Sequence, residues 1–143
     1  MIREIIILTR TGVPIFQKRF GSGSGFGSDV SLISGFISAV NTFAQELTSS
    51  SVQIIEMGKM KLVFHMDDVN CIHAIVCDIS DEMVDVGVII RKIAETFQNM
   101  YASEVEQYKG DIRVFRNFDE VLEKMDITGM EEIAIPDAQI PPT

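Results

Sequence analysis

A glycine-rich segment, Gly21–Gly27, is the part of the sequence whose composition most suggests a loop that cradles a phosphate. A phosphate loop of the Walker type ends in Gly-Lys-Ser/Thr, but here Ser28-Asp29 follows the last glycine. The dinucleotide-binding fingerprint needs a third glycine where this chain has Phe26 or Ser28. The carboxylate of Asp29, at the start of the next predicted helix, would also repel a phosphate. The segment is therefore interpreted as a flexible connector.

Two histidines and one serine are the other residues with catalytic potential. His65 and His73 lie on neighbouring predicted strands, but no Cys-x-x-Cys or His-Glu-x-x-His spacing accompanies them, and zinc takes three or four ligands. Ser24 is not in a Gly-x-Ser-x-Gly motif, and a flexible loop does not hold a nucleophile within reach of its base. A hydrolase using Ser24, or a metal at the histidines, is the least favoured hypothesis. No catalytic residue, metal or cofactor is predicted.

The two cysteines, Cys71 and Cys77, are six residues apart in one predicted strand. At about 3.3 Å per residue they are roughly 20 Å apart, too far for a disulfide. Unpaired thiols indicate a reducing compartment, and we expect both side chains to be buried. No apolar run approaches the roughly 18 residues that span a bilayer, and the start of the chain lacks a signal-peptide layout. These features predict a cytoplasmic protein without direct membrane insertion.

The net charge of −9 is concentrated in the second half of the chain. Residues 1–70 carry six acids and six bases, whereas residues 71–143 carry fifteen acids and six bases. An acidic surface repels phosphate, which argues against nucleic acid as a partner. It suits a basic patch on another protein, and simple solubility explains it equally well.

The hydrophobic periodicity predicts an α+β domain with the order β-β-α-β-β-β-α-α. The expected strands and helices cover residues 2–8, 13–20, 29–47, 52–57, 61–66, 71–79, 83–101 and 119–125. Pro14 suits the start of a strand or an edge strand, because it cannot donate a ladder hydrogen bond. Short turns predict that the three consecutive strands form an antiparallel meander. The strand that contains His73 is apolar on both faces, which places it in the middle of the sheet.

The second long helix is predicted to begin at the caps within residues 78–82 and to reach about Tyr101. Its expected buried stripe comprises Val84, Val88, Ile89, Ile93, Phe97 and Met100. We expect one domain over residues 1–125, followed by an acidic tail, residues 126–143, that contains prolines.

Two segments resemble known domains. The hairpin Ile5-Ile6-Ile7-Leu8-Thr9-Arg10-Thr11-Gly12-Val13-Pro14-Ile15-Phe16 is similar to the opening of longin-like domains. The segment Leu32-Ile33-Ser34-Gly35-Phe36-Ile37-Ser38-Ala39-Val40-Asn41-Thr42-Phe43-Ala44 resembles their first helix. The resemblance covers residues 1–125 and includes the element order. It implies a profilin-like α-β-α sandwich, in which a five-stranded antiparallel sheet has its first helix on one face and the later helices on the other.

Longin-like domains belong to a SNARE-like superfamily related to the roadblock domains, and they act as adaptors, often as homodimers or heterodimers. Several bind small GTPases, and the stand-alone form resembles archaeal single-domain longin proteins. The resemblance therefore implies a non-enzymatic protein-interaction module, an adaptor or a small-GTPase-associated scaffold in an assembly resembling membrane or vesicle traffic. Its partner would be a small GTPase or another longin or roadblock domain.

The expected contact surface combines the first helix with the third strand. Gly35 allows close approach of another backbone, and aromatic side chains supply anchors of the kind found at interface centres. The proposed interface residues are Gly35, Phe36, Val40, Phe43, Val52 and Ile54. Unpaired edge strands offer a second route, by pairing with a partner's strand. The alternative function is a sensor that encloses a small apolar molecule between helix and sheet.

Overall fold

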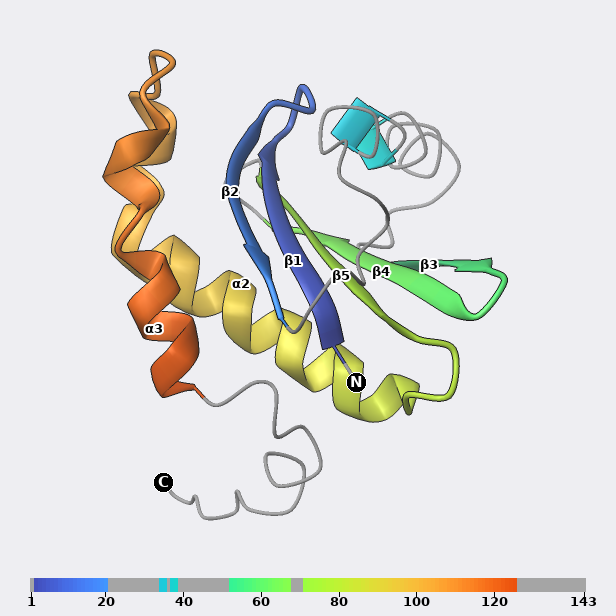
Figure 1. Cartoon of the computed structure of the whole chain (residues 1–143). Coiled ribbons are helices and arrows are strands. Elements are labelled where there is room, and N and C mark those ends of the chain that lie inside the picture. Colours follow the sequence, from blue (N-terminus) through green and yellow to red (C-terminus); the bar gives the residue numbers. More distant parts are fainter. Residues whose placement is uncertain (1, 21–33, 36, 39–51, 68–70, 126–143) are drawn as a thin grey trace.

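The computed structural model describes residues 2–20, 34–35, 37–38, 52–67 and 71–125. Five strands form one sheet, and two helices and a 3₁₀ turn follow the last strand (Figure 1). Their bounds are β1 Ile2–Thr9, β2 Pro14–Arg19, β3 Val52–Met57, β4 Met60–Met66, β5 Cys71–Asp78, α2 Met83–Glu106, η1 Ile112–Phe115 and α3 Phe118–Lys124. The predicted helix over 29–47 lies largely outside the described residues, but 34–35 and 37–38 are helical.

The strands are antiparallel and lie in the order β2-β1-β5-β4-β3. The meander of β3, β4 and β5 and the hairpin of β1 and β2 are both as predicted, and β1 joins them by pairing with β5. Gly12 and Gly58 have positive φ values of 93° and 64°, which the turns after β1 and β3 require and other residues rarely adopt. β2 begins at Pro14 and is an edge strand, so both positions that suit a proline are found here, and β3 is the other edge.

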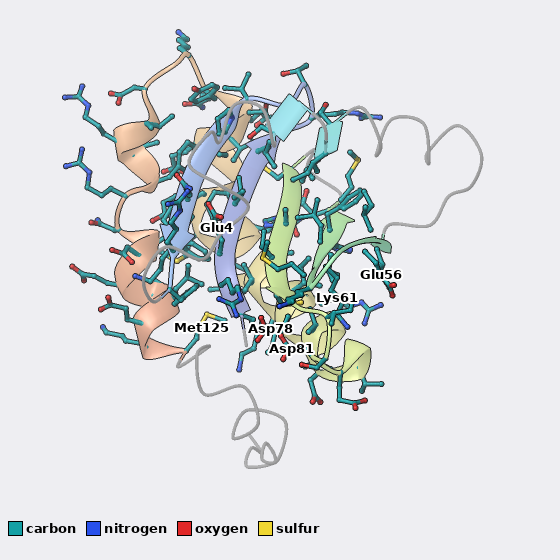
Figure 2. All side chains as sticks on the ribbon, turned by 45° about the vertical axis from the view of Figure 1, so that its right-hand side comes forward. Glu4, Glu56, Lys61, Asp78, Asp81 and Met125 are labelled. Carbon is teal, nitrogen blue, oxygen red and sulfur yellow. The ribbon has the colours of Figure 1, made fainter. Side chains whose placement is uncertain are left out.

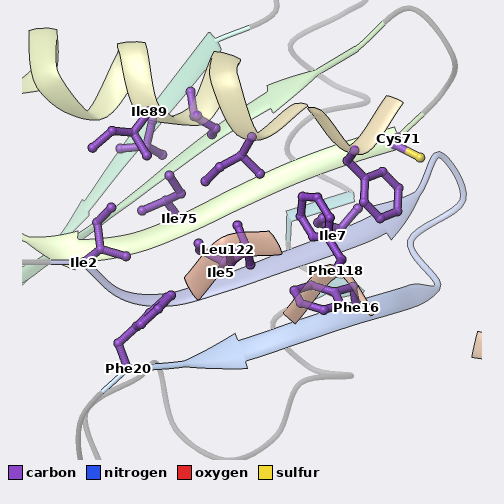
Figure 3. Close-up of a cluster of buried hydrophobic side chains, with 14 of the residues drawn as sticks. Ile2, Ile5, Ile7, Phe16, Phe20, Cys71, Ile75, Ile89, Phe118 and Leu122 are labelled. Carbon is purple, nitrogen blue, oxygen red and sulfur yellow. The ribbon is translucent and has the colours of Figure 1, made fainter. Parts of the chain in front are cut away.

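Each face of the sheet supports its own hydrophobic cluster. On one face, here called the α2 face, Ile5, Ile7 and Ile75 pack beneath α2 and α3 (Figure 3). On the opposite face, Ile6, Leu8, Phe64 and Ala74 pack with the helical Ile37. Side chains alternate between faces along a strand, so a strand covered on both sides has to be apolar throughout. This is why β5 is buried from Cys71 to Cys77, as its composition predicted.

Helix α2 is rotated relative to the prediction. Ile89, Ile93 and Phe97 are buried as expected, but Val84 and Val88 are 77% and 53% exposed, and Met100 is also exposed. The buried stripe instead comprises Val86, Ile89, Ile90, Ile93, Ala94, Phe97 and Tyr101. Apolar residues lie on both sides of this helix, so periodicity alone admitted two orientations. In the orientation that the structure adopts, the ring of Tyr101 packs against Phe115 and Phe118.

The connection from β5 to α2 is stabilised by charged groups rather than by the predicted helix caps. The N-cap residue, Glu82, makes no side-chain capping hydrogen bond. Instead the ammonium of the buried Lys61 donates to the backbone carbonyl oxygens of Ile79 and Asp81. Figure 2 shows Lys61, Asp78 and Asp81 close together where α2 begins. These bonds tie the β5–α2 connection to β4; they do not replace a side-chain cap, which would have to accept from the backbone N–H groups of the first turn.

A group of aromatic rings joins α2, η1 and α3 to β2. Phe97 lies 5.0 Å from Phe118 and 5.6 Å from Phe115, measured between ring centroids. Phe118 also meets Phe16 of β2 edge-to-face at 5.3 Å, and Tyr101 packs on the same rings. Because Phe115 and Phe118 are fully buried, the chain from η1 to α3 is fixed against the β2 side of the sheet. The sequence did not predict η1.

Candidate protein interface

Only part of the predicted interface lies in the described residues. Phe36, Val40 and Phe43 lie outside them, and of Val52 only the backbone, in β3, is described. Gly35 is exposed in the helical segment, and no atom lies within 4 Å of where a Cβ would be. Ile54 in β3 is 46% exposed.

Gly35 and Ile54 belong to opposite faces of the sheet. The cross-strand partner of Ile54 is Val63, which belongs to the cluster on the α2 face. Gly35 lies two residues from Ile37, which packs on the opposite face. A partner that contacts both residues would therefore have to cover the β3 edge from two sides.

The β3 edge directs backbone hydrogen-bonding groups outward. The turn at Gly58-Lys59 joins Met57 to Met60, and partners that flank a two-residue turn form a hydrogen-bonded pair. Hydrogen-bonded and non-bonded pairs alternate along an antiparallel ladder. The N–H and C=O groups of Val52, Ile54 and Glu56 consequently point away from β4. An added strand could bond to these groups.

The described part of the first helix packs close to the β1–β2 turn. A Cβ built on Gly12 would lie 2.9 Å from the Ser38 Cβ, so only glycine fits there. Ile37 is fully buried against Ile6 and Phe64. This contact fixes which side of the helix faces the sheet and leaves Gly35 facing outward.

A groove of about 420 Å³ runs beside the other edge strand. Its walls are β2 on one side and the η1 region with the start of α3 on the other. The lining residues are Ile15, Phe16, Gln17, Lys18, Arg19, Ile112, Arg113, Arg116 and Asp119. The groove lies at the sheet edge rather than between a helix and a sheet face, where the sensor hypothesis would need it.

Ion pairs organise the charged side chains of this groove. Lys18 donates to the carboxylate of Asp119, and its ammonium lies 3.4 Å from Glu123. The hydrogen bond that Lys18 donates to Asp119 raises the pKa of Lys18. Arg113 bonds both carboxylate oxygens of Asp111, which lowers the pKa of that carboxyl to about 2.

The groove was not predicted, although two sequence signals indicated part of it. Pro14 indicated an edge, and the polar run Gln17-Lys18-Arg19 is typical of a strand that faces solvent. The other wall comes from η1, roughly a hundred residues later in the chain. No spacing rule brings these two segments together.

Glu4 is a buried carboxylate on the face opposite α2 (Figure 2). It accepts a hydrogen bond from the side-chain amide of Gln17, and the Arg19 Nε lies 3.5 Å from its carboxylate. Buried charges need such partners. Glu4 therefore ties the β2 side chains on this face to β1.

The two histidines are directly opposite each other on β4 and β5, on the α2 face. His73 is 1% exposed, packs against Phe97 and hydrogen-bonds through Nε2 to the Asp67 carboxylate at 2.8 Å. The same carboxylate accepts from the Cys71 backbone N–H at 2.9 Å. Among the described residues, no group of three or more His, Cys, Asp or Glu side chains could hold a metal ion. Asp67 and His73 act as a structural pair that secures the β4–β5 connection.

Both cysteines are buried free thiols, as expected. Burial raises the pKa of the Cys71 thiol to about 12 and that of Cys77 to about 11. The thiolate is the reactive form of cysteine, so these side chains act as small apolar core residues. Ser24 and the rest of the glycine-rich segment lie outside the described residues. In the described part of the chain, no helix is long and apolar enough to cross a membrane.

No family model matches the sequence, and no curated protein matches it. Solved structures do match. The chain is similar to "MglB with tetrameric arrangement", with a TM-score of 0.63 and 14% identity over 73% of this chain and 79% of the other. It is also similar to a Roadblock/LC7 domain from Streptomyces avermitilis, with a TM-score of 0.51 and 10% identity over 75% and 84%. A structure of the mammalian SRP receptor matches with a TM-score of 0.55 and 14% identity over 94% and 98%.

Identities of 10–14% carry information about the fold alone. The five-stranded antiparallel sheet and its helices match these neighbours, as the resemblance to longin-like domains implied. The chain has the α+β fold shared by longin and roadblock domains.

Proposed function

We propose that this protein is a non-enzymatic interaction module that self-associates through the β3 edge and serves a small-GTPase-associated assembly. The proposal rests on one observation about this edge. Backbone N–H and C=O groups of β3 point outward, and beside them the apolar side chain of Ile54 is 46% exposed. Unpaired strand edges are templates for pairing with another chain unless charges, bulges or covering segments prevent it. The described part of β3 contributes only one charged side chain, Glu56.

The residues with catalytic potential support a binding role rather than a reaction. His73 and Asp67 are buried in a mutual hydrogen bond, and the thiols of Cys71 and Cys77 have raised pKa values. A catalytic group has to reach its substrate, and these side chains face the core. The small-GTPase association rests on the resemblance to longin-like domains, several of which bind small GTPases. The likeness to MglB and to the SRP receptor supports the fold on which that resemblance rests.

Sedimentation equilibrium of the whole chain tests the self-association. We expect a dimer whose dissociation constant rises at least about tenfold in Ile54→Asp, because a charge would then be buried at the interface. Unchanged far-ultraviolet circular dichroism would show that the variant is folded. The matched control is Val13→Asp, which places the same charge on an exposed apolar residue of the β1–β2 turn. A monomer at every concentration, or a dimer indifferent to Ile54→Asp, contradicts the proposal.

The GTPase association is tested separately by titrating the chain with purified small GTPases from its source. Each GTPase is loaded with GDP or with a non-hydrolysable GTP analogue. We expect binding that differs between the two states, because a regulatory partner has to have unequal affinity for them. Absence of binding to every GTPase in both states would remove this part of the function and leave self-association in place.

A further inference from the structure

We propose that the groove between β2 and η1 binds an extended acidic segment of a protein partner, which adds as a strand beside β2. The inference rests on the proposed function only in that the occupant is a protein. The surface is distinct from the β3 edge, which lies at the far side of the sheet.

Along β2, residues whose backbone groups bond to β1 alternate with residues whose backbone groups point away from it, and strand addition needs the second kind. The Phe20 N–H donates to the Arg3 carbonyl at 2.9 Å, so residues 3 and 20 form a hydrogen-bonded pair. Moving along the ladder, Glu4 and Arg19 form a non-bonded pair, Ile5 and Lys18 a bonded one, and Ile6 and Gln17 a non-bonded one. The N–H and C=O groups of Gln17 and Arg19 therefore point away from β1, towards the groove.

The groove has the size and shape for an extended chain. Its volume of about 420 Å³ is within the range of pockets that hold small ligands. All five residues from Ile15 to Arg19 line it, so it follows the strand over most of its length. Ile112 of η1 is 49% exposed at the opposite wall, where it offers apolar contact to alternate side chains of the occupant.

The charge of the lining selects an acidic occupant. Four cationic side chains and one carboxylate line the groove, in a chain whose net charge is −9. Arg116 is exposed, and no carboxylate of the described residues is within ion-pair distance of it. Lys18 and Arg113 already bond to exposed carboxylates of the chain itself. The Arg19 Nε lies 3.5 Å from the buried Glu4 carboxylate, so an incoming carboxylate would share these three cations. Complementary charge of this kind governs specificity and association rate more than affinity.

The test is a titration of the ¹⁵N-labelled whole chain with a blocked synthetic peptide of alternating glutamate and valine, equal in length to β2. We expect chemical-shift changes concentrated at the amides of Gln17, Arg19 and Arg116. Raising the ionic strength should weaken the binding, since exposed charges are screened. A peptide with lysine in place of glutamate should not bind. Two results would overturn the proposal: absence of any shift, or equal binding of the lysine peptide.

Two matched variants test the charge, and modified peptides test the backbone pairing. Arg116→Glu should raise the dissociation constant about tenfold, because an attraction becomes a repulsion, whereas Arg91→Glu on the outer side of α2 should not change it. Two glutamate–valine peptides are compared, one N-methylated at every glutamate and the other at every valine, because only one of these alternating sets of N–H groups can face β2. One of the two peptides should bind much more weakly than the unmodified peptide. Unchanged binding of both would overturn strand addition.

The acidic segment 126–143 of the chain itself is the competing occupant. If the free chain shows slow exchange at the Gln17 and Arg19 amides, and the peptide displaces resonances of residues 126–143, the occupant is internal and the proposal of an external partner is overturned. If the external-partner proposal fails in this way, self-association through the β3 edge, as measured by sedimentation, is unaffected. A monomeric chain that still binds the peptide would overturn the proposed function alone.

Discussion

The two edges of the sheet present the same kind of backbone with different surroundings. β2 carries Gln17, Lys18 and Arg19, and is bounded by η1 and α3 through a ring contact and ion pairs. In the described residues of β3, an exposed isoleucine stands beside one glutamate, and the strand's only sheet partner is β4. Charged residues on an edge discourage indiscriminate pairing. The comparison suggests a selective edge at β2 and an edge suited to stable association at β3.

The greatest loss of stability is expected where β2 contacts the core, and comparing it with a change at β3 tests whether β2 is anchored in the core and β3 is not. Phe118→Ala should lower the free energy of unfolding by about 3–5 kcal/mol, because Phe118 is fully buried against the rings of Phe16 and Phe97. Ile54→Ala at the other edge should change it by about 0.5 kcal/mol or less in the monomer. Urea denaturation at low protein concentration measures both. Similar losses for the two variants would remove the distinction between the edges.

A smaller effect tests how the β3 side is attached to the rest of the sheet. Asp67→Ala should lower the free energy of unfolding by about 1–3 kcal/mol, because it leaves the buried His73 ring and the Cys71 N–H without this acceptor. Hydrogen exchange should accelerate in β3 and β4 more than in β1 and β2. Asp111→Ala, which removes an exposed carboxylate paired with Arg113, is the control. A uniform loss of protection would contradict the separate attachment.

The smallest effect concerns acid stability near the start of α2. The hydrogen bond from Arg3, with an Nε–Oδ1 distance of 2.6 Å, lowers the pKa of Asp78. A carboxyl whose folded pKa is depressed stabilises the protein above its unfolded pKa, near 3.9, and this contribution disappears as the pH falls through the folded value. Arg3→Met should therefore flatten the acid limb of the stability curve below about pH 4 by less than about 1 kcal/mol. An unchanged acid limb would show that the pair contributes nothing.

The strands and their meander were predictable because β-branched runs such as Ile5–Leu8 and short turns specify them locally. The central position of β5 followed from its apolar residues on both faces. The buried side of α2 was predicted in part wrongly, because Val84 and Val88 fit a helical stripe as well as Val86 and Ile90 do. Contacts between residues distant in the sequence, with the sheet and with Phe115 and Phe118, decide between the two orientations.

The candidate surfaces were less accessible to sequence reasoning. The expectation of a contact surface at Ile54 came from placing the interface at the first helix and the third strand, and it stays a prediction. The β2 groove depends on η1, which Asp111 caps locally but whose position against the sheet is determined by the contacts of Phe115 with Phe97 and Tyr101. Its cations, Arg113 and Arg116, have no sequence spacing that links them to Lys18.

Concentration-dependent hydrogen exchange tests directly whether this protein associates through the β3 edge. We expect the outward amides of Val52, Ile54 and Glu56 to become protected as the protein concentration rises, while those of Gln17 and Arg19 do not change. Protection that appears at β2 instead, or exchange at β3 that is independent of concentration, would contradict it.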